Sequence, residues 1–183
     1  MGLVTNVVVA SILTVASLAG GPGDPLKIKP SQTMAGADSK INKPMVRMIA
    51  TEAQWKELWN MHKGVPAVVS DKGEVTYPNA PAPPAVDFEK DKVLVVFGGK
   101  LVNIQKYDYV KTYAKDDIAV VQLTQNKVPD STSSAIMTPY IMMVIPKEPV
   151  AIEVELDSTA KDGSHFWMKI AAYRAPKDGK TSG

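Results

Sequence analysis

The sequence predicts a mainly β domain, an antiparallel β-sandwich or a partly open barrel, with one amphipathic helix packed against it. Short apolar runs separated by turn residues recur along the second half of the chain. This pattern is typical of antiparallel strands rather than of alternating strand–helix–strand units. By contrast, residues 51–62 carry apolar side chains at helical spacing. We therefore expect one β-rich domain over residues 44–174.

Composition and charge narrow the classes of function. Of the 183 residues, 45% are hydrophobic and 22% charged, which is ordinary for one globular domain with flanking segments. The net charge is +2, and arginine occurs only at Arg47 and Arg174, so the sequence argues against nucleic acid as a partner. Cysteine is absent, which excludes disulfides, thiol catalysis, thiolate metal sites and a lipid-modified N-terminal cysteine.

The first residues predict export. Residues 3–19 are uncharged and rich in Val, Leu, Ile and Ala, and Ser17-Leu-Ala19 precedes Gly20 as a small-x-small cleavage pattern. We expect residues 1–19 to be a signal peptide and the mature protein to be secreted or held in the cell envelope. No Lys or Arg precedes the apolar run, so an uncleaved membrane anchor, a mis-assigned start and a buried helix stay open as alternatives.

The segments that flank the domain are poor in core-forming residues. Residues 20–25 read Gly-Gly-Pro-Gly-Asp-Pro, and glycine and proline do not sustain a regular helix. The residues that follow, up to position 43, are mostly small and polar. We expect residues 20–43 to form a flexible linker and residues 175–183 a disordered tail.

The helix prediction rests on its ends and on one face. Thr51 is the expected N-cap, Gln54 completes a Thr-x-x-Gln capping box, and Gly64 is placed to end the helix. The apolar face follows an i, i+3, i+4, i+7 rhythm, through Trp55, Leu58, Trp59 and His62. A helix this short is marginal alone, so it must bury its indoles, either on its own sheet or on another subunit.

Strands are expected at several apolar or alternating runs. Residues 92–97 are almost continuously apolar, so we expect both faces of this strand to be covered. The remaining strands are expected at residues 45–50, 75–77, 103–113, 118–123, 140–145, 150–156 and 166–173, with a polar loop over residues 157–164.

The strand at residues 103–113 offers a candidate binding surface. Strict alternation places Tyr107, Tyr109 and Tyr113 on one face of this strand. Tyrosine is enriched in protein-binding patches, so an exposed tyrosine face would be a contact surface. The alternative is cross-strand packing of these rings within a sheet. Trp55 and Trp59 are further candidate binding residues.

The chain carries no recognisable catalytic or metal-binding pattern. Zinc needs three or four ligands, and the two histidines, His62 and His165, are far apart in a chain without cysteine. The hydroxyls of Ser131–Ser134 follow Pro129-Asp130 in a loop-like setting, and no Gly-x-Ser-x-Gly motif occurs. The acidic residues Asp116, Asp117 and Asp157 are typical of turns. We expect no enzymatic activity, cofactor or metal.

An ordered set of short motifs resembles a known family. The chain is similar, over about residues 46–156, to the C-terminal domain of PrcB-type protease-complex subunits. The resemblance rests on Glu52-x-x-Trp55-x-x-Leu58-Trp59-x-x-His62, Pro84-Ala-Val-Asp-Phe88, Val95-Val-Phe97-Gly98, Pro129, Thr138-Pro-Tyr140 and Val144-Ile-Pro146. It implies an exported, noncatalytic accessory domain whose partner is another protein, an exported protease.

Two other functions stay open. A β-sandwich peptidase inhibitor would need a protruding loop, for which residues 78–84 and 98–103 are candidates. The family's Gly-Gly-Tyr-like loop is replaced here by Gly98-Gly-Lys-Leu-Val-Asn103, which weakens the inhibitor hypothesis. A structural protein of the cell envelope is the other alternative.

Overall fold

The computed structural model describes residues 29–116, 118–128, 135–148, 151–160 and 163–174. The described part is mainly β, with sheets that do not close into a barrel, as a β-sandwich requires. The predicted fold class is confirmed. The expected signal peptide (residues 1–19), the expected tail (residues 175–183) and the Ser131–Ser134 segment lie outside the described residues.

The first sheet has four strands in the order β1-β10-β5-β2, and every neighbouring pair is antiparallel. The two central strands are apolar and the two edge strands are more polar, which matches their positions. The strands are β1 (Gln32–Gly36), β2 (Pro44–Ile49), β5 (Asp91–Gly98) and β10 (Tyr140–Pro146).

The second sheet has the order β12-β11-β8-β7. Its β7–β8 and β11–β12 pairs are antiparallel, but the central β8–β11 pair is parallel. The parallel pair arises because the chain visits the first sheet as β10 before it returns as β11. The strands are β7 (Ile104–Lys115), β8 (Ile118–Lys127), β11 (Ala151–Thr159) and β12 (His165–Arg174).

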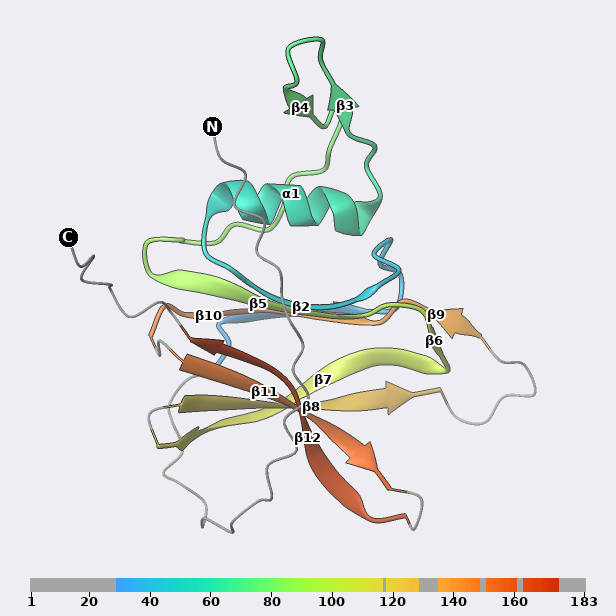
Figure 1. The fold of residues 1–183 in the computed structure, drawn as a ribbon, viewed down its shortest axis with the longest axis vertical. Coiled ribbons are helices and arrows are strands. Elements are labelled where there is room, and N and C mark those ends of the chain that lie inside the picture. Colours follow the sequence, from blue (N-terminus) through green and yellow to red (C-terminus); the bar gives the residue numbers. More distant parts are fainter. Residues whose placement is uncertain (1–28, 117, 129–134, 149–150, 161–162, 175–183) are drawn as a thin grey trace, which may run out of the picture.

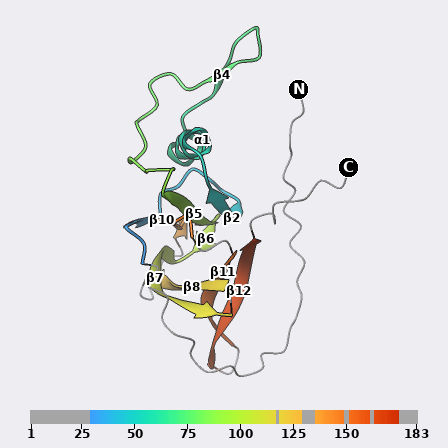
Figure 2. The same cartoon turned by 90° about the vertical axis from the view of Figure 1, so that its left-hand side faces the viewer.

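Two small strand pairs and one helix complete the described structure. The hairpin of β3 (Val68–Val69) and β4 (Val75–Thr76) stands beyond the helix, at the end of the molecule farthest from the second sheet (Figures 1 and 2). A second pair joins β6 (Leu101–Val102) to β9 (Ile136–Met137). The helix is α1 (Glu52–Lys63).

Figure 1 shows three layers: α1, the first sheet and the second sheet. Alternate residues of β5 enter different cores, since successive strand side chains point to opposite faces. Leu94 and Val96 pack against the second sheet, whereas Val93, Val95 and Phe97 pack beneath α1. The expectation that both faces of this strand are covered is therefore confirmed.

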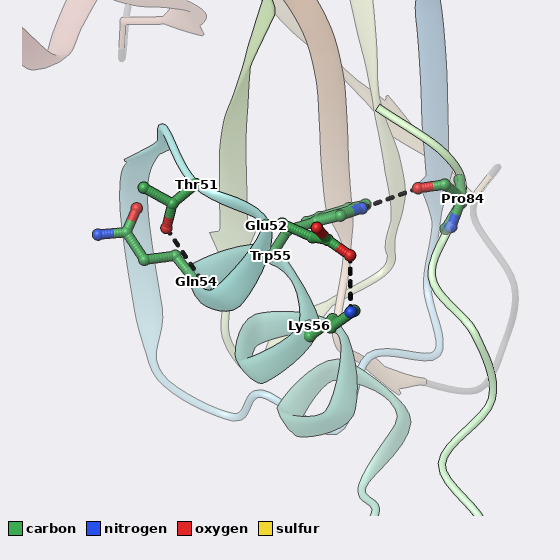
Figure 3. Close-up of polar contacts among 6 residues, drawn as sticks. All are labelled: Thr51, Glu52, Gln54, Trp55, Lys56 and Pro84. Atoms are coloured by element: carbon green, nitrogen blue, oxygen red, sulfur yellow. Dashed lines mark hydrogen bonds and ion pairs between the residues drawn. The ribbon is translucent and has the colours of Figure 1, made fainter. Parts of the chain in front are cut away.

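The helix begins and ends as its sequence predicts, with one difference (Figure 3). The Thr51 hydroxyl accepts the Gln54 backbone N–H at 3.3 Å, and Gly64 adopts a left-handed conformation with φ 69° at the C-terminus. The Gln54 side-chain oxygen accepts the N–H of Ala50 at 3.1 Å, one residue earlier than a capping box requires. The cap therefore holds the end of β2 as well as the helix.

The tryptophan face of α1 meets the domain's own sheet. Trp55 and Leu58 are each 1% exposed and lie in the core beneath the helix. The indole N–H of Trp55 donates to the carbonyl of Pro84 at 2.9 Å (Figure 3). Trp59 packs against Trp55 with ring centroids 5.5 Å apart and stays partly exposed. The hydrogen bond from Trp55 to Pro84 ties the proline-rich segment to the helix.

The expected linker over residues 20–43 is wrong for its second half. Residues Gln32–Gly36 form β1, an edge strand in register with β10, and Ser39 and Ile41 are buried. An edge strand is held by backbone hydrogen bonds, which small polar residues supply as well as apolar ones. Met34 adds the apolar contact that the strand needs beneath the helix.

Candidate functional site

The three candidate tyrosines do not form one surface. Tyr107 is 4% exposed and belongs to the core between the sheets, and Tyr109 packs against the same core. The ladder with β8 shifts between Tyr109 and Lys111, so Val110 is an extra residue that reverses the alternation. Tyr113 consequently lies on the opposite, outer face. The expected tyrosine face is wrong, and Tyr107 and Tyr109 follow the packing alternative.

Tyr113 belongs instead to a polar cluster on the outer face of the second sheet. Its hydroxyl donates to the Glu155 carboxylate at 3.2 Å, and the Gln122 side-chain amide donates to the same oxygen at 2.8 Å. Burial, followed by the Glu155 charge, raises the pKa of Tyr113 to about 12. Lys111 lies over the Tyr113 ring at 5.6 Å. The cluster's polar groups are largely committed to one another, so it is a structural network.

His62 is buried and neutral. It is 1% exposed, and its Nδ1 lies 3.1 Å from the Ser39 hydroxyl oxygen. Burial, followed by the charge of Lys63, lowers the pKa of His62 to about 4, although a helix C-terminus favours a positive charge. The rings of His62 and Tyr140 pack edge to face, with their centroids 4.4 Å apart. A neutral imidazole closed off from solvent stabilises the core and has no access to a substrate.

His165 is exposed, and its Nδ1 lies 3.2 Å from a carboxylate oxygen of Asp157. In the part of the chain that the structure describes, no group of three or more His, Asp or Glu side chains is placed to hold a metal ion. Within the same residues, no helix has the length and apolar content of a membrane span.

A cleft opens in the second sheet where its central strands separate. The β8–β11 ladder ends at Leu123 and Leu156. Beyond these residues β8 remains paired with β7 as far as Lys127, and β11 remains paired with β12 as far as Thr159. The two hairpins therefore diverge, as Figure 1 shows. The cleft has a volume of about 490 Å³ and is lined by Thr124, Gln125, Lys127, Asp157, Ser158, Thr159 and His165.

The cleft is polar and has a closed end. At that end the Thr124 hydroxyl donates to the Asp157 carboxylate at 3.5 Å, a long contact between the first residues beyond the end of the β8–β11 ladder. Asp157 also contacts His165, whereas Lys127 makes no ion pair with any described residue. The carboxylate and the ammonium group lie on strands that face each other across the cleft.

The expected strands at residues 118–123 and 150–156 stop short of the observed ends of β8 and β11, so we did not foresee this site. The expected loop over residues 157–164 is wrong for its first three residues because β11 continues to Thr159, and Asp157 is a strand residue rather than the expected turn residue. A signal was present: each strand changes from apolar to polar at the same register, after Leu123 in one and after Leu156 in the other. Two polar strand ends side by side indicate a sheet that opens to solvent.

Exposed apolar side chains lie beside the cleft, on both faces of an edge strand. Phe166, Trp167 and Met168 are 46%, 42% and 44% exposed on β12, an edge strand of the sheet. Because strand side chains alternate, Trp167 lies on one face and its two neighbours on the other. We call these three residues the aromatic arm. Large apolar residues in succession on an exposed strand are typical of interaction sites.

A second, smaller groove lies beside α1. The proline-rich stretch Ala82–Val86 forms one wall, and Glu52 and Lys56 of the helix form the other. Its volume is about 380 Å³. Glu52 and Lys56 are paired with each other at 2.6 Å (Figure 3), and the Pro84 carbonyl is occupied by Trp55. The proline-rich segment serves here as a connector fixed to the helix.

Comparison with known proteins adds no relative. The chain matched no family model, no curated protein and no solved structure. Among the described residues, the cleft and the aromatic arm are two exposed features that the packing of the two cores does not explain.

Proposed function

We propose that this chain is an exported, noncatalytic module that binds another protein and serves as the accessory subunit of an exported protease. The observation that carries the binding role is the aromatic arm: three large apolar side chains stay exposed on an edge strand next to an open cleft. Burying Phe166 and Trp167 in an interface would supply contacts of the kind that dominate protein-binding energies.

A binding role accounts for the described polar groups better than catalysis does. The buried His62 is neutral and enclosed. The exposed His165 is oriented by the Asp157 carboxylate. Nucleophilic catalysis would also require a hydroxyl or thiol held against its ring as the nucleophile. The described contacts of the two histidines therefore support recognition rather than chemistry.

The class of partner and the location come from the sequence. The uncharged apolar run at residues 3–19 supports export. The resemblance to PrcB-type protease-complex subunits supports a protease as the partner. A purely structural role in the envelope would leave the aromatic arm without a function.

Site-specific photo-crosslinking tests the proposal. A benzophenone derivative of phenylalanine replaces Phe166 in the full chain, which is produced in the cells that naturally make it. The control carries the same group at Met61, which is 42% exposed on α1 in the opposite layer. We expect an adduct with one protein from position 166 and none from position 61, with the partner identified by mass spectrometry and the complex rebuilt from purified components.

The identity of the adduct separates the candidate functions. An exported peptidase would support the accessory role, provided that its activity is maintained or raised in the rebuilt complex. A partner of another class would retain the binding role and remove the protease from the proposal. Equal or absent adducts at the two positions would overturn the binding role and favour a structural envelope protein.

One observation favours a peptidase inhibitor as a second candidate. The β3–β4 hairpin projects away from the helix (Figure 2), and its residues Val68, Val69 and Val75 are 50–63% exposed. The backbone holds the turn, since Gly73 N–H donates to Ser70 O at 2.8 Å. A rigid exposed loop is what an inhibitor inserts into an active site.

Titration against serine and cysteine peptidases checks this second function. We expect inhibition at micromolar concentration, with the β3–β4 hairpin resisting cleavage, and loss of inhibition when Val69 is changed to Asp. Val102→Asp is the control, because Val102 is 55% exposed on β6 instead. Rapid cleavage within residues 68–76 without inhibition would remove the inhibitor function.

A further inference from the structure

The geometry of the cleft points to a specific ligand: we propose that it receives the free amino-terminal segment of a partner protein, which adds a short strand between β8 and β11. This inference rests on the proposed binding function and names the part of the partner that is recognised. The strand edges, the volume, the closed end and the charges of the cleft each favour this ligand.

The backbone groups of both cleft walls are unpaired on the side that faces the cleft. Residues 124–127 of β8 and residues 157–159 of β11 each have one strand neighbour, on the side away from the cleft. On the cleft side, no described residue pairs with them after Leu123 and Leu156. Both walls thus present the unpaired edge of a strand, which is a template for an extended peptide.

The volume of the cleft limits the length of the strand that can be added. In a sheet, one residue occupies about 160 Å³, from a rise near 3.3 Å, a strand spacing near 4.8 Å and a layer thickness near 10 Å. The cleft, at about 490 Å³, therefore accommodates about three residues. This length agrees with the walls, because β11 extends three residues beyond Leu156.

The closed end of the cleft favours a chain terminus over an internal segment. Since β8 and β11 pair directly up to Leu123 and Leu156, an inserted strand cannot continue past Thr124 and Asp157, whose side chains are in contact. An inserted segment must stop or turn back there. A chain terminus stops without a turn, so a terminus fits this end better than an internal segment.

The charges of the cleft favour an amino terminus over a carboxyl terminus. The closed end carries the Asp157 carboxylate, which would attract an α-ammonium group and repel an α-carboxylate. The cleft wall ends at Lys127, whose ammonium group has no ion pair among the described residues. An α-ammonium group would join Thr124 and His165 at the Asp157 carboxylate, and an acidic side chain near the third residue would pair with Lys127. Such an amino-terminal segment runs parallel to β8 and β11.

A peptide array tests this inference. The probe is a set of hexapeptides, each attached through its carboxyl end, with randomised first four positions and with a duplicate of every peptide acetylated at the amino end. We expect the full-length protein to retain peptides with a free amine and an Asp or Glu near position three. Acetylation should weaken binding of the selected peptides at least tenfold in solution.

Matched substitutions locate the contacts. Asp157→Asn should remove the preference for a free amine, whereas Glu153→Gln, an acidic residue at the other end of β11, should leave it intact. Lys127→Glu should weaken binding of acidic peptides at least tenfold, whereas Lys115→Glu, at another exposed lysine, on β7, should not. The far-ultraviolet circular dichroism spectrum of each variant confirms that it is folded.

Hydrogen exchange distinguishes strand addition from side-chain docking. Saturating peptide should slow amide exchange within residues 124–127 and 157–159 and leave β3–β4 unchanged. Equal binding of acetylated peptides, protection elsewhere, or no retained peptide would each overturn the inference. These failures are separate from failure of the proposed function: an adduct at position 166 without peptide binding would retain the binding module and remove this ligand.

Discussion

The imidazole of His62 and the hydroxyl of Ser39 meet inside the protein, with Nδ1 3.1 Å from Oγ. The same Ser39 oxygen accepts the backbone N–H of Ile41 at 3.1 Å, so one buried hydroxyl joins the end of α1 to the segment that follows β1. The His62 Nε2 atom has no hydrogen-bond partner among the described residues. Protonation of the ring would leave a buried positive charge at Nε2 without a partner. The stability of the folded protein should therefore depend on the protonation of His62.

The protein should lose stability in mild acid because of His62. The pKa of His62 is about 4 in the folded state, below its usual value of 6.5. A group with a lowered folded pKa contributes stability above the unfolded pKa, and this stability is lost as pH falls towards the folded pKa. We expect the free energy of unfolding to fall by about 3 kcal/mol between pH 6.5 and 4.

Urea denaturation of the wild type and of His62→Gln at a series of pH values checks this. The glutamine variant keeps a polar side chain but does not titrate, so the difference between the two proteins isolates His62 from the carboxylates. The stability difference should shrink as pH falls. A difference that is constant from pH 7 to pH 4 would refute the role of His62.

Truncating Trp55 should cost much more than truncating an equally large exposed residue. Trp55 is 1% exposed and donates its indole N–H to Pro84 O, so Trp55→Ala should lower the free energy of unfolding by about 3–5 kcal/mol. Trp167→Ala, at a position that is 42% exposed, should change it by about 0.5 kcal/mol or less. Similar losses in the two variants, measured in urea, would contradict the packing described beneath α1.

Gly98 should not tolerate a side chain unless Tyr107 yields space. A Cβ at Gly98 would collide with the Tyr107 hydroxyl and lie 2.8 Å from Leu101 Cδ1 and 3.0 Å from Pro139 Cγ. Gly98→Ala should cost about 1–3 kcal/mol of stability. Tyr107→Phe removes the nearest colliding atom, so the double variant should recover part of the loss. Additive effects in this thermodynamic cycle would show that the two residues are not coupled.

Loss of the helix cap should have a moderate effect. Thr51→Ala removes the hydroxyl that accepts the Gln54 N–H and should lower stability by about 1 kcal/mol. Thr51→Ser keeps an acceptor and should cost less. Thermal unfolding of the three proteins measures the order, and an alanine variant as stable as the serine variant would contradict the cap.

Local signals in the sequence were enough to predict the helix and the central strand. Thr51 and Gly64 act through neighbouring backbone groups, so their roles depend little on the rest of the fold. The continuous apolar run of β5 indicates that both faces of the strand are buried, whichever elements cover them. These features could be predicted because their physics involves residues that are close in sequence or burial on both sides.

Features that depend on distant pairing could not be predicted in this way. β1 is held by β10, a partner far along the chain, and its own residues carry little apolar signal. The extra residue Val110 is recognisable only against the register of β8, and without it the alternation of Tyr109 and Tyr113 predicted the wrong face. The cleft depends on two strands that separate, a property that neither strand contains alone.

The pairing of β1 with β10 has a consequence for how the chain acquires its structure. The Ser31 hydroxyl donates to Val144 O across 113 residues. The first described strand, β1, can therefore pair only after β10 has been synthesised. Sheets closed by such distant contacts fold slowly, in milliseconds to seconds. A growing chain that stopped before residue 140 would expose the edge of β5 to other chains, so the interval between the synthesis of β5 and that of β10 is when this protein is most vulnerable to aggregation.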